Sequence, residues 1–138
     1  MSTGKNTPRS SCPIACALDI LGDRWTLIVL RDVLLDNRRV FSEIAVQEKI
    51  ATNTLTNRLD RLIIAGVLEK QKDPSDGRSY QYIPTECGLE LIPVLIDLMV
   101  WGSKYTSGSG PTGILERAVT DREALLTELI EHTSASED

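Results

Sequence analysis

Residues 50–83 read IATNTLTNRLDRLIIAGVLEKQKDPSDGRSYQYI and carry the clearest structural pattern of the chain. A helix is predicted over Thr52–Ala65, because one apolar stripe recurs there at helical spacing and Gly66 follows as a stop signal. The stripe is formed by Leu55, Leu59, Leu62 and Ile63. A charged strand at Leu68–Asp73, a turn at Pro74–Gly77 and a return strand at Ser79–Ile83 would form a β-ribbon. This order predicts a winged helix-turn-helix, a mainly α fold with a small β-ribbon (α+β).

The polar face of the predicted helix is rich in short hydrogen-bonding and cationic side chains. It consists of Thr52, Asn53, Thr54, Thr56, Asn57, Arg58 and Arg61. Arginine and asparagine can recognise guanine and adenine edges, and threonine hydroxyls reach phosphates. An ordinary solvated face, which is the alternative, would favour glutamate and lysine because they are better helix formers. The pattern therefore predicts that this helix binds the major groove of double-stranded DNA.

Three further arginines are predicted to contact the same DNA. Arg78 follows the ribbon turn, where a guanidinium fits a narrow minor groove or a phosphate; an ordinary surface charge beside a good hairpin turn is the alternative. Arg38 and Arg39 lie between helices and are predicted phosphate contacts rather than solvated charges. The net charge is −5, yet residues 1–85 hold 12 basic and 10 acidic side chains, and residues 86–138 hold 3 and 10. The acidic half is thus expected to face away from DNA.

The segments before the predicted reading helix are shorter and less regular. Residues 1–10 are expected to form a flexible arm. A helix should begin at Pro13, which suits the first helical position, and end near Leu21. A second helix is predicted over Arg24–Leu35. Arg38–Phe41 is a candidate short strand, and Ser42–Gln47 a short helix with Ser42 as its cap.

After the ribbon, Thr85 is expected to cap a long helix, Glu86–Tyr105, that Pro93 should kink. This helix is apolar almost all round, which a small monomer cannot bury, so a homodimer is predicted. The expected interface residues are Leu18, Leu95, Leu98, Met99, Trp101, Leu126 and Leu129.

The chain is expected to end in an accessory segment. A flexible break at residues 107–111 precedes a helix over Asp121–His132, whose start carries a capping-box pattern of Thr120 and Glu123. The expected organisation is therefore an arm (1–10), a winged-helix domain with dimerisation helices (11–105) and a linker with an accessory helix (106–138).

Several functional classes find no support in the residues. The one histidine, His132, cannot serve a triad assembled from distant segments, and neither a phosphate loop nor a metal motif is present. We therefore expect no enzymatic activity, no cofactor and no metal. No apolar run approaches a membrane span and no signal peptide is evident, so a cytoplasmic protein without a membrane partner is expected. A protein–protein adaptor that uses the winged helix without specific DNA is the alternative function.

Cys12 is the candidate sensor of oxidants. It stands at a helix start, where free N–H groups and the macrodipole favour a thiolate. The alternative, which the residues alone favour, is a semi-buried cysteine that acts as a small apolar side chain. Cys12 and Cys16 are expected to be too far apart for an unstrained disulfide. A zinc site from these two, Cys87 and His132 has no familiar spacing.

The chain also resembles a known family, the HxlR-type transcriptional regulators, which are relatives of the MarR group. The resemblance runs in order from Cys12 to Gly102. Its matching runs are Cys12-Pro13, Ala17–Thr26, Arg38–Ile44, Leu55–Leu62, Ala65–Leu68, Tyr82–Leu91 and Trp101-Gly102. It implies a dimeric winged-helix repressor or activator that binds a pseudo-palindromic operator and dimerises through its first and last helices. Because several such proteins sense electrophiles or oxidants at the cysteine matching Cys12, it also implies a redox or small-effector response.

Three features depart from the family pattern. Val40 stands where the family usually continues directly from two arginines to phenylalanine. Ala51 occupies a position where serine or threonine commonly caps the next helix, so Thr52 is expected to cap instead. The tail beyond Gly102 is long for the family.

Overall fold

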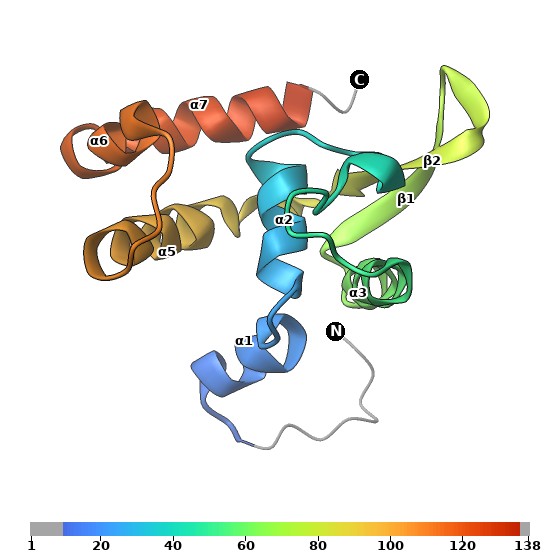
Figure 1. Cartoon of the computed structure of the whole chain (residues 1–138), viewed down its shortest axis with the longest axis horizontal. Coiled ribbons are helices and arrows are strands. Elements are labelled where there is room, and N and C mark those ends of the chain that lie inside the picture. Colours follow the sequence, from blue (N-terminus) through green and yellow to red (C-terminus); the bar gives the residue numbers. More distant parts are fainter. Residues whose placement is uncertain (1–9, 136–138) are drawn as a thin grey trace. The chain divides into compact units, whose positions relative to one another are not determined.

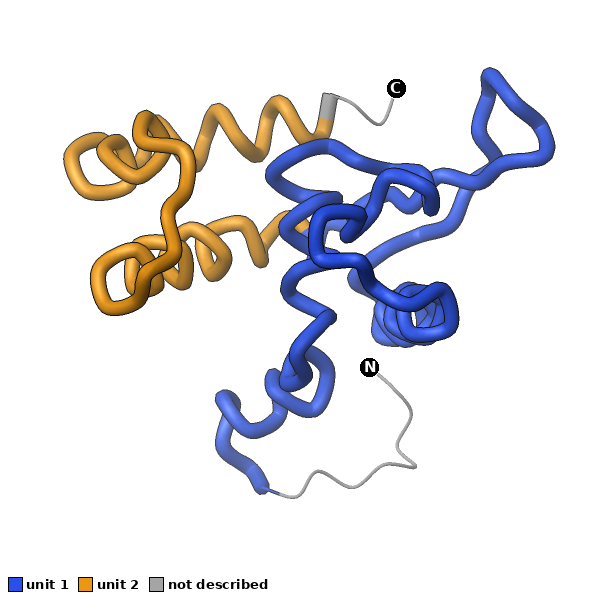
Figure 2. The backbone as a smooth tube through the Cα atoms, viewed as in Figure 1, with its two compact units in different colours: residues 1–88 blue, residues 89–138 orange. Residues whose placement is uncertain are grey.

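The computed structural model describes residues 10–135 and confirms a mostly helical chain with one two-stranded antiparallel sheet (Figure 1). The chain divides into two compact units, the first ending at Gly88 and the second beginning at Leu89 (Figure 2). The arm predicted at residues 1–10 lies almost entirely outside the described residues.

The first unit contains the winged helix-turn-helix. Its elements are α1 (Pro13–Leu21), α2 (Thr26–Leu34), the 3-10 turn η1 (Phe41–Glu43), α3 (Thr52–Ile64), β1 (Leu68–Asp73), β2 (Asp76–Pro84) and α4 (Glu86–Leu89). Four side chains of α2 that are fully buried form the centre of the core, namely Val29, Leu30, Val33 and Leu34. The predicted stripe of α3 supplies Leu55, Leu59 and Leu62, and the sheet supplies Leu68 and Ile83. The apolar spacing therefore orients α3 with its polar face outward.

Helix α3 ends as the sequence predicts, because Gly66 adopts a φ of 80°. The amide of Gly66 donates to the carbonyl of Ile63 (3.0 Å), and that of Val67 donates to Leu62 (2.9 Å). This pair of bonds is a Schellman motif, which satisfies carbonyls that the end of a helix leaves free. The predicted cap at the other end is wrong. Ala51 is the N-cap residue and Thr52 is already helical, so no side chain closes the start.

The β-ribbon pairs β1 with β2 in a register that places Leu68 opposite Pro84 and Lys72 opposite Tyr80. An irregularity after Lys72 brings Asp73 opposite Asp76, so the return strand starts three residues earlier than Ser79. Lys70 lies over the rings of two tyrosines on the facing strand, 4.5 Å from the centroid of Tyr80 and 6.0 Å from that of Tyr82.

The segment between α2 and α3 differs from the expected strand and helix. Val40 makes an isolated bridge to Gln81 instead of a strand over Arg38–Phe41. The helix predicted over Ser42–Gln47 is replaced by η1 and turns, because Ala45 has a φ of 55°. A left-handed residue cannot continue a right-handed helix. It is held there by its amide, which donates to the buried carboxylate of Asp32 at 2.6 Å.

The second unit consists of α5 (Ile92–Tyr105), α6 (Thr112–Thr120) and α7 (Arg122–Ala135). The predicted kinked helix Glu86–Tyr105 is in fact two helices, because α4 ends at Leu89 and Pro93 lies in the first turn of α5. Proline lacks an N–H and clashes within a helix, so it fits best at a helix start.

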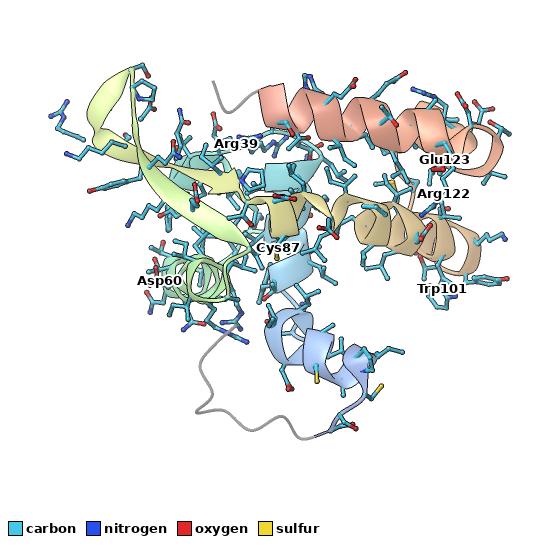
Figure 3. All side chains as sticks on the ribbon, turned by 180° about the vertical axis from the view of Figure 1, so that it is seen from behind. Arg39, Asp60, Cys87, Trp101, Arg122 and Glu123 are labelled. Atoms are coloured by element: carbon cyan, nitrogen blue, oxygen red, sulfur yellow. The ribbon has the colours of Figure 1, made fainter. Side chains whose placement is uncertain are left out.

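The tail contains one helix more than predicted. Helix α6 follows residues 107–111, which form no regular element, and ends where the capping box was expected. The Thr120 hydroxyl donates to the carbonyl of Glu116 (2.9 Å) within α6 rather than capping α7. Arg117 forms a bidentate ion pair with Glu128, and Arg122 at the start of α7 (Figure 3) pairs with Asp97.

Candidate nucleic-acid interface

The outward face of α3 presents most of the predicted DNA-reading side chains to solvent. Exposed residues are Thr52, Asn53, Thr56, Asn57 and Arg61, whereas Thr54 and Arg58 are half-buried. Two residues absent from the sequence prediction share this face. Asp60, labelled on α3 in Figure 3, is exposed, and Ile64 has an exposed fraction of 72 %. Their positions follow from helical spacing, since Asp60 lies four residues after Thr56 and Ile64 four residues after Asp60. The face thus combines hydrogen-bonding, cationic, acidic and apolar groups.

A carboxylate from outside α3 reaches this face. Oδ1 of Asp23, in the loop before α2, accepts hydrogen bonds from the amides of Trp25 (2.8 Å) and Thr26 (3.0 Å) and from Nε of Arg58 (3.0 Å). Oδ2 accepts from the Thr26 hydroxyl at 2.5 Å and lies 3.7 Å from Nη1 of Arg61. The sequence prediction omitted Asp23, although an aspartate just before a helix is a known capping signal.

The environment of Asp23 keeps it ionised. Burial raises the pKa of its carboxyl, but hydrogen bonds from the Thr26 hydroxyl, the Trp25 amide and Arg58 outweigh burial and lower the pKa to about 2. Arg58 is also bonded within α3, since its Nη1 donates to Oδ1 of Asn57 at 2.6 Å. Two predicted DNA-reading residues are therefore linked to each other and to the start of α2.

The tip of the β-ribbon is ordered by aspartates. Oδ1 of Asp73 accepts from the amide and the hydroxyl of Ser75, which lowers the pKa of Asp73. Asp76 accepts from the amide of Arg78 at 3.0 Å. The side chain of Arg78 is 95 % exposed, so its charge is presented to solvent. Its Nε lies 3.8 Å from Oδ1 of Asp76.

The two arginines before η1 differ in accessibility. Arg38 is half-buried, whereas Arg39 has an exposed fraction of only 7 %. Nη2 of Arg39 donates to Oδ1 of Asn37 at 3.0 Å, and its carbonyl accepts from the amide of Tyr82 at 2.8 Å. The geometry therefore favours Arg38 over Arg39 as a surface charge for phosphate.

A shallow groove of about 400 Å³ separates η1 from the ribbon. Its lining residues are Val40, Phe41, Ser42, Arg78, Ser79, Tyr80 and Tyr82. Arg78, a predicted DNA contact, thus also forms part of the wall of this groove.

Cys12 is the N-cap residue of α1 and is exposed. The backbone amides of Ala15 and Ile14 at the helix start lower the pKa of its thiol. Cys16 is half-buried and its thiol donates to the carbonyl of Ser10 at 3.3 Å, while Cys87 on α4 (Figure 3) is exposed. The accessible, polarised position of Cys12 differs from the semi-buried cysteine that the residues alone favoured.

Helices α1 and α5 each expose an apolar stripe. No residue of α1 is buried, and its Ile14 and Leu18, one turn apart, are 71 % and 50 % exposed. On α5 the exposed large side chains are Val94 (44 %), Leu98 (50 %), Trp101 (60 %) and Tyr105 (68 %). Residues at this spacing share one side of a helix. Leu95, which the sequence predicted for the same interface, is 6 % exposed and has little surface to offer a partner. The other predicted interface residues, Met99, Leu126 and Leu129, are half-buried.

Two further findings concern residues 10–135 only. No helix in this range is long and apolar enough to cross a membrane. The same range contains no group of three or more His, Cys, Asp or Glu side chains placed to hold a metal ion.

Comparison with known proteins places this geometry in context. An uncharacterized HTH-type transcriptional regulator of Mycobacterium bovis is 36 % identical over 89 residues, which is 64 % of this chain and 56 % of that protein. The chain thus spans little more than half the length of that relative. The structure of PA1607, described as a candidate transcription factor, superposes with a TM-score of 0.67 at 30 % identity, covering 75 % of this chain and 73 % of the other.

A third likeness is to the reduced form of the transcriptional regulator YodB from Bacillus subtilis. It has a TM-score of 0.57 at 28 % identity and covers 72 % of this chain and all of that one. The family model of the HxlR-like helix-turn-helix matches residues 20–109, which include α2, α3, the ribbon and α5. The chain therefore belongs to the HxlR-like helix-turn-helix family.

Proposed function

We propose that this protein is a transcriptional regulator that binds a specific DNA sequence as a homodimer. The observation that carries the proposal is the exposed face of α3, with Asn57 at its centre, in a chain whose ribbon tip projects the 95 % exposed side chain of Arg78. A reading helix in the major groove and a ribbon tip at the backbone or minor groove are the two contacts that a winged helix-turn-helix makes with DNA.

The chemistry of α3 supports base recognition more than general charge attraction. The NH₂ group of Asn57 can donate to base edges, and the Thr56 methyl and hydroxyl can meet a thymine methyl or a phosphate. Arg61, with a side chain that is 45 % exposed, supplies a phosphate contact. Asp60 can accept from the amino group of cytosine and would disfavour a phosphate at the same place.

The homodimer is supported by the apolar stripes of α1 and α5. A nine-residue helix without a single fully buried residue, such as α1, gains little packing energy from its own chain. A two-fold partner would cover Leu18 and Leu98 and would present two copies of α3 to successive major grooves of a pseudo-palindromic operator.

An oxidant or electrophile is the proposed effector, with Cys12 as the reacting group. The exposed thiol with a lowered pKa supports this role. YodB, at 28 % identity, has been solved in reduced and in diamide-treated forms. Because α1 also carries Ile14 and Leu18, a modified Cys12 would lie within one turn of the proposed dimer contact.

An adaptor without specific DNA binding is the alternative, and no enzymatic activity is proposed. Selection from a random duplex pool separates the two functions. The wild type should enrich a two-fold symmetric sequence whose half-sites lie about one helical turn, roughly 34 Å, apart. In fluorescence anisotropy, Asn57→Ala should weaken binding to that sequence by about 1–3 kcal/mol. Thr127→Ala, an exposed substitution on α7, is the matched control and should bind as the wild type does. An adaptor would enrich no sequence.

A further inference from the structure

Arg58 is the residue of the reading face whose charge is already compensated within the protein. Its Nε donates to Oδ1 of Asp23 at 3.0 Å, and the side chains of Arg58 and Asp23 are only 21 % and 22 % exposed. Arg61 also approaches Asp23, but at 3.7 Å and with a side chain that is 45 % exposed. The two arginines of α3 therefore differ, because the guanidinium of Arg58 is hydrogen-bonded to Asp23, whereas that of Arg61 lies farther from Asp23 and is more exposed.

The carboxylate that holds Arg58 is itself fixed. Asp23 accepts two backbone bonds at the start of α2 and one from the Thr26 hydroxyl, and Thr26 is 1 % exposed. A pKa of about 2 keeps Asp23 charged at any pH near neutrality. Surface ion pairs are usually weak because both side chains lose conformational entropy when they pair. Because Asp23 is already held in place, its pair with Arg58 costs less of this entropy. The pair therefore joins α3 to α2 across 35 positions of sequence.

The same guanidinium also donates a hydrogen bond to the side-chain amide of Asn57. Nη1 of Arg58 donates to Oδ1 of Asn57 at 2.6 Å, and Asn57 is exposed at the centre of the reading face. With its oxygen engaged by a cation, the exposed Asn57 amide keeps its NH₂ group as the donor for other partners. Such an amide donates to base acceptors, such as guanine O6 and N7 or thymine O4.

We propose that Asp23 and Arg58 are positioning residues, which orient Asn57 for base recognition and do not themselves bind phosphate. The proposal rests on the proposed DNA-binding function, and it gives Arg58 and Arg61 of α3 different roles. Arg58 determines which bases are preferred, through Asn57, and Arg61 contributes sequence-independent attraction to the backbone. Asp23 acts on specificity from outside the helix that contacts DNA.

Salt dependence distinguishes these roles, because each neutralised phosphate changes the slope of log K against log salt by about one. The probes are a labelled duplex selected by the wild type from a random pool and a scrambled duplex of the same composition. Affinities for both are measured by anisotropy at four KCl concentrations. The variants are Asp23→Asn, which keeps an acceptor for the α2 amides, Arg58→Ala, the double variant, and Arg61→Ala as the matched control. Thermal melts establish that each variant is folded.

Asp23→Asn and Arg58→Ala should each lower the ratio of selected to scrambled affinity by about tenfold, and the double variant should lose no more than either single one. Arg58→Ala should keep the wild-type salt slope, whereas Arg61→Ala should flatten it by about one and keep the ratio. A flattened slope with an unchanged ratio in Arg58→Ala, or additive losses in the double variant, would overturn the proposal. Should Asp23→Asn not fold, the slope and ratio of Arg58→Ala decide alone. A wild type that prefers no sequence would instead refute the proposed function.

Discussion

The carboxylate of Asp32 accepts a 2.6 Å hydrogen bond from the amide of Ala45, and both residues are fully buried. Its other oxygen accepts from Nε of Arg31 at 2.9 Å, and Arg31 forms a bidentate pair with Glu48 at 2.8 and 3.0 Å. This network holds the segment between α2 and α3 in a conformation that includes the left-handed Ala45. The position of the start of α3 therefore depends on a buried charge in α2.

Removal of that charge should destabilise the fold. In Asp32→Ala the Ala45 amide loses its acceptor inside the protein, which costs about 1–3 kcal/mol in the free energy of unfolding. Urea denaturation measures the loss. Asp36→Asn is the control, because burial and the charge of Asp32 raise the pKa of Asp36. A carboxylate with a raised pKa is less stable in the folded state, so this variant should be as stable as the wild type or slightly more so at pH 7. Equal losses of stability in both variants would show that the bond between Asp32 and the Ala45 amide is not the cause.

Asp23 should dominate the response of the first unit to acid. Its pKa falls from 3.8 in the unfolded chain to about 2 in the folded one, so its contribution is complete above pH 4 and is lost as the pH falls through 2. The shift corresponds to about 2 kcal/mol. Thermal melts between pH 2 and pH 6 should show a steep loss for the wild type and a shallower one for Asp23→Asn. Parallel curves would show that other carboxyl groups govern acid unfolding.

The apolar stripe of α5 should be required for dimerisation. Leu98→Glu places a charge where a partner would exclude water, so sedimentation at micromolar concentration should give the mass of one chain. Val119→Glu on α6 is the control. Val119 is 73 % exposed, more than Leu98, yet it lies outside the proposed stripe, so this variant should sediment like the wild type at two chains. A wild-type mass of one chain would refute the dimer.

Cys12 should be the most reactive thiol of the protein. The amides that lower the pKa of Cys12 increase its thiolate fraction at pH 7, and the side chain is exposed. Limiting maleimide followed by mass mapping should therefore label Cys12 first. Cys87, exposed on α4, serves as an internal comparison for accessibility. Earlier labelling of Cys87 would show that accessibility, rather than the helix start, controls reactivity.

Local signals determined the elements that carry the proposed function. The leucine spacing and the glycine stop depend only on residues within one or two helical turns of each other. The predicted extent of α3 therefore agrees with the observed one to within one residue. The paired strands β1 and β2 also follow from a turn and its flanking residues. The polar face of α3 was evident for the same reason, because helical spacing alone decides which side chains face away from the apolar stripe.

Elements whose conformation depends on distant partners were not predicted correctly. Ala45 carries no local signal for a left-handed φ, and the buried carboxylate 13 positions earlier imposes it. Helix α6 is short and contains Gly113, so its intrinsic helix propensity is low. Its contacts with α5 and α7 and the pair Arg117–Glu128 hold it within the second unit.

The sequence by itself determined which side chains lie on the outward face of α3, because helical periodicity and stop signals act between near neighbours. The tertiary structure decided which of those side chains are held by other parts of the protein. Arg58 and Arg61 are equivalent in sequence, both cationic and both on the same helix. Only the fold brings Asp23, 35 positions away from Arg58, to within 3.0 Å of one and 3.7 Å of the other. The energy of an ion pair decreases with distance and with exposure to water. Asp23 therefore holds the guanidinium of Arg58 more strongly than that of Arg61.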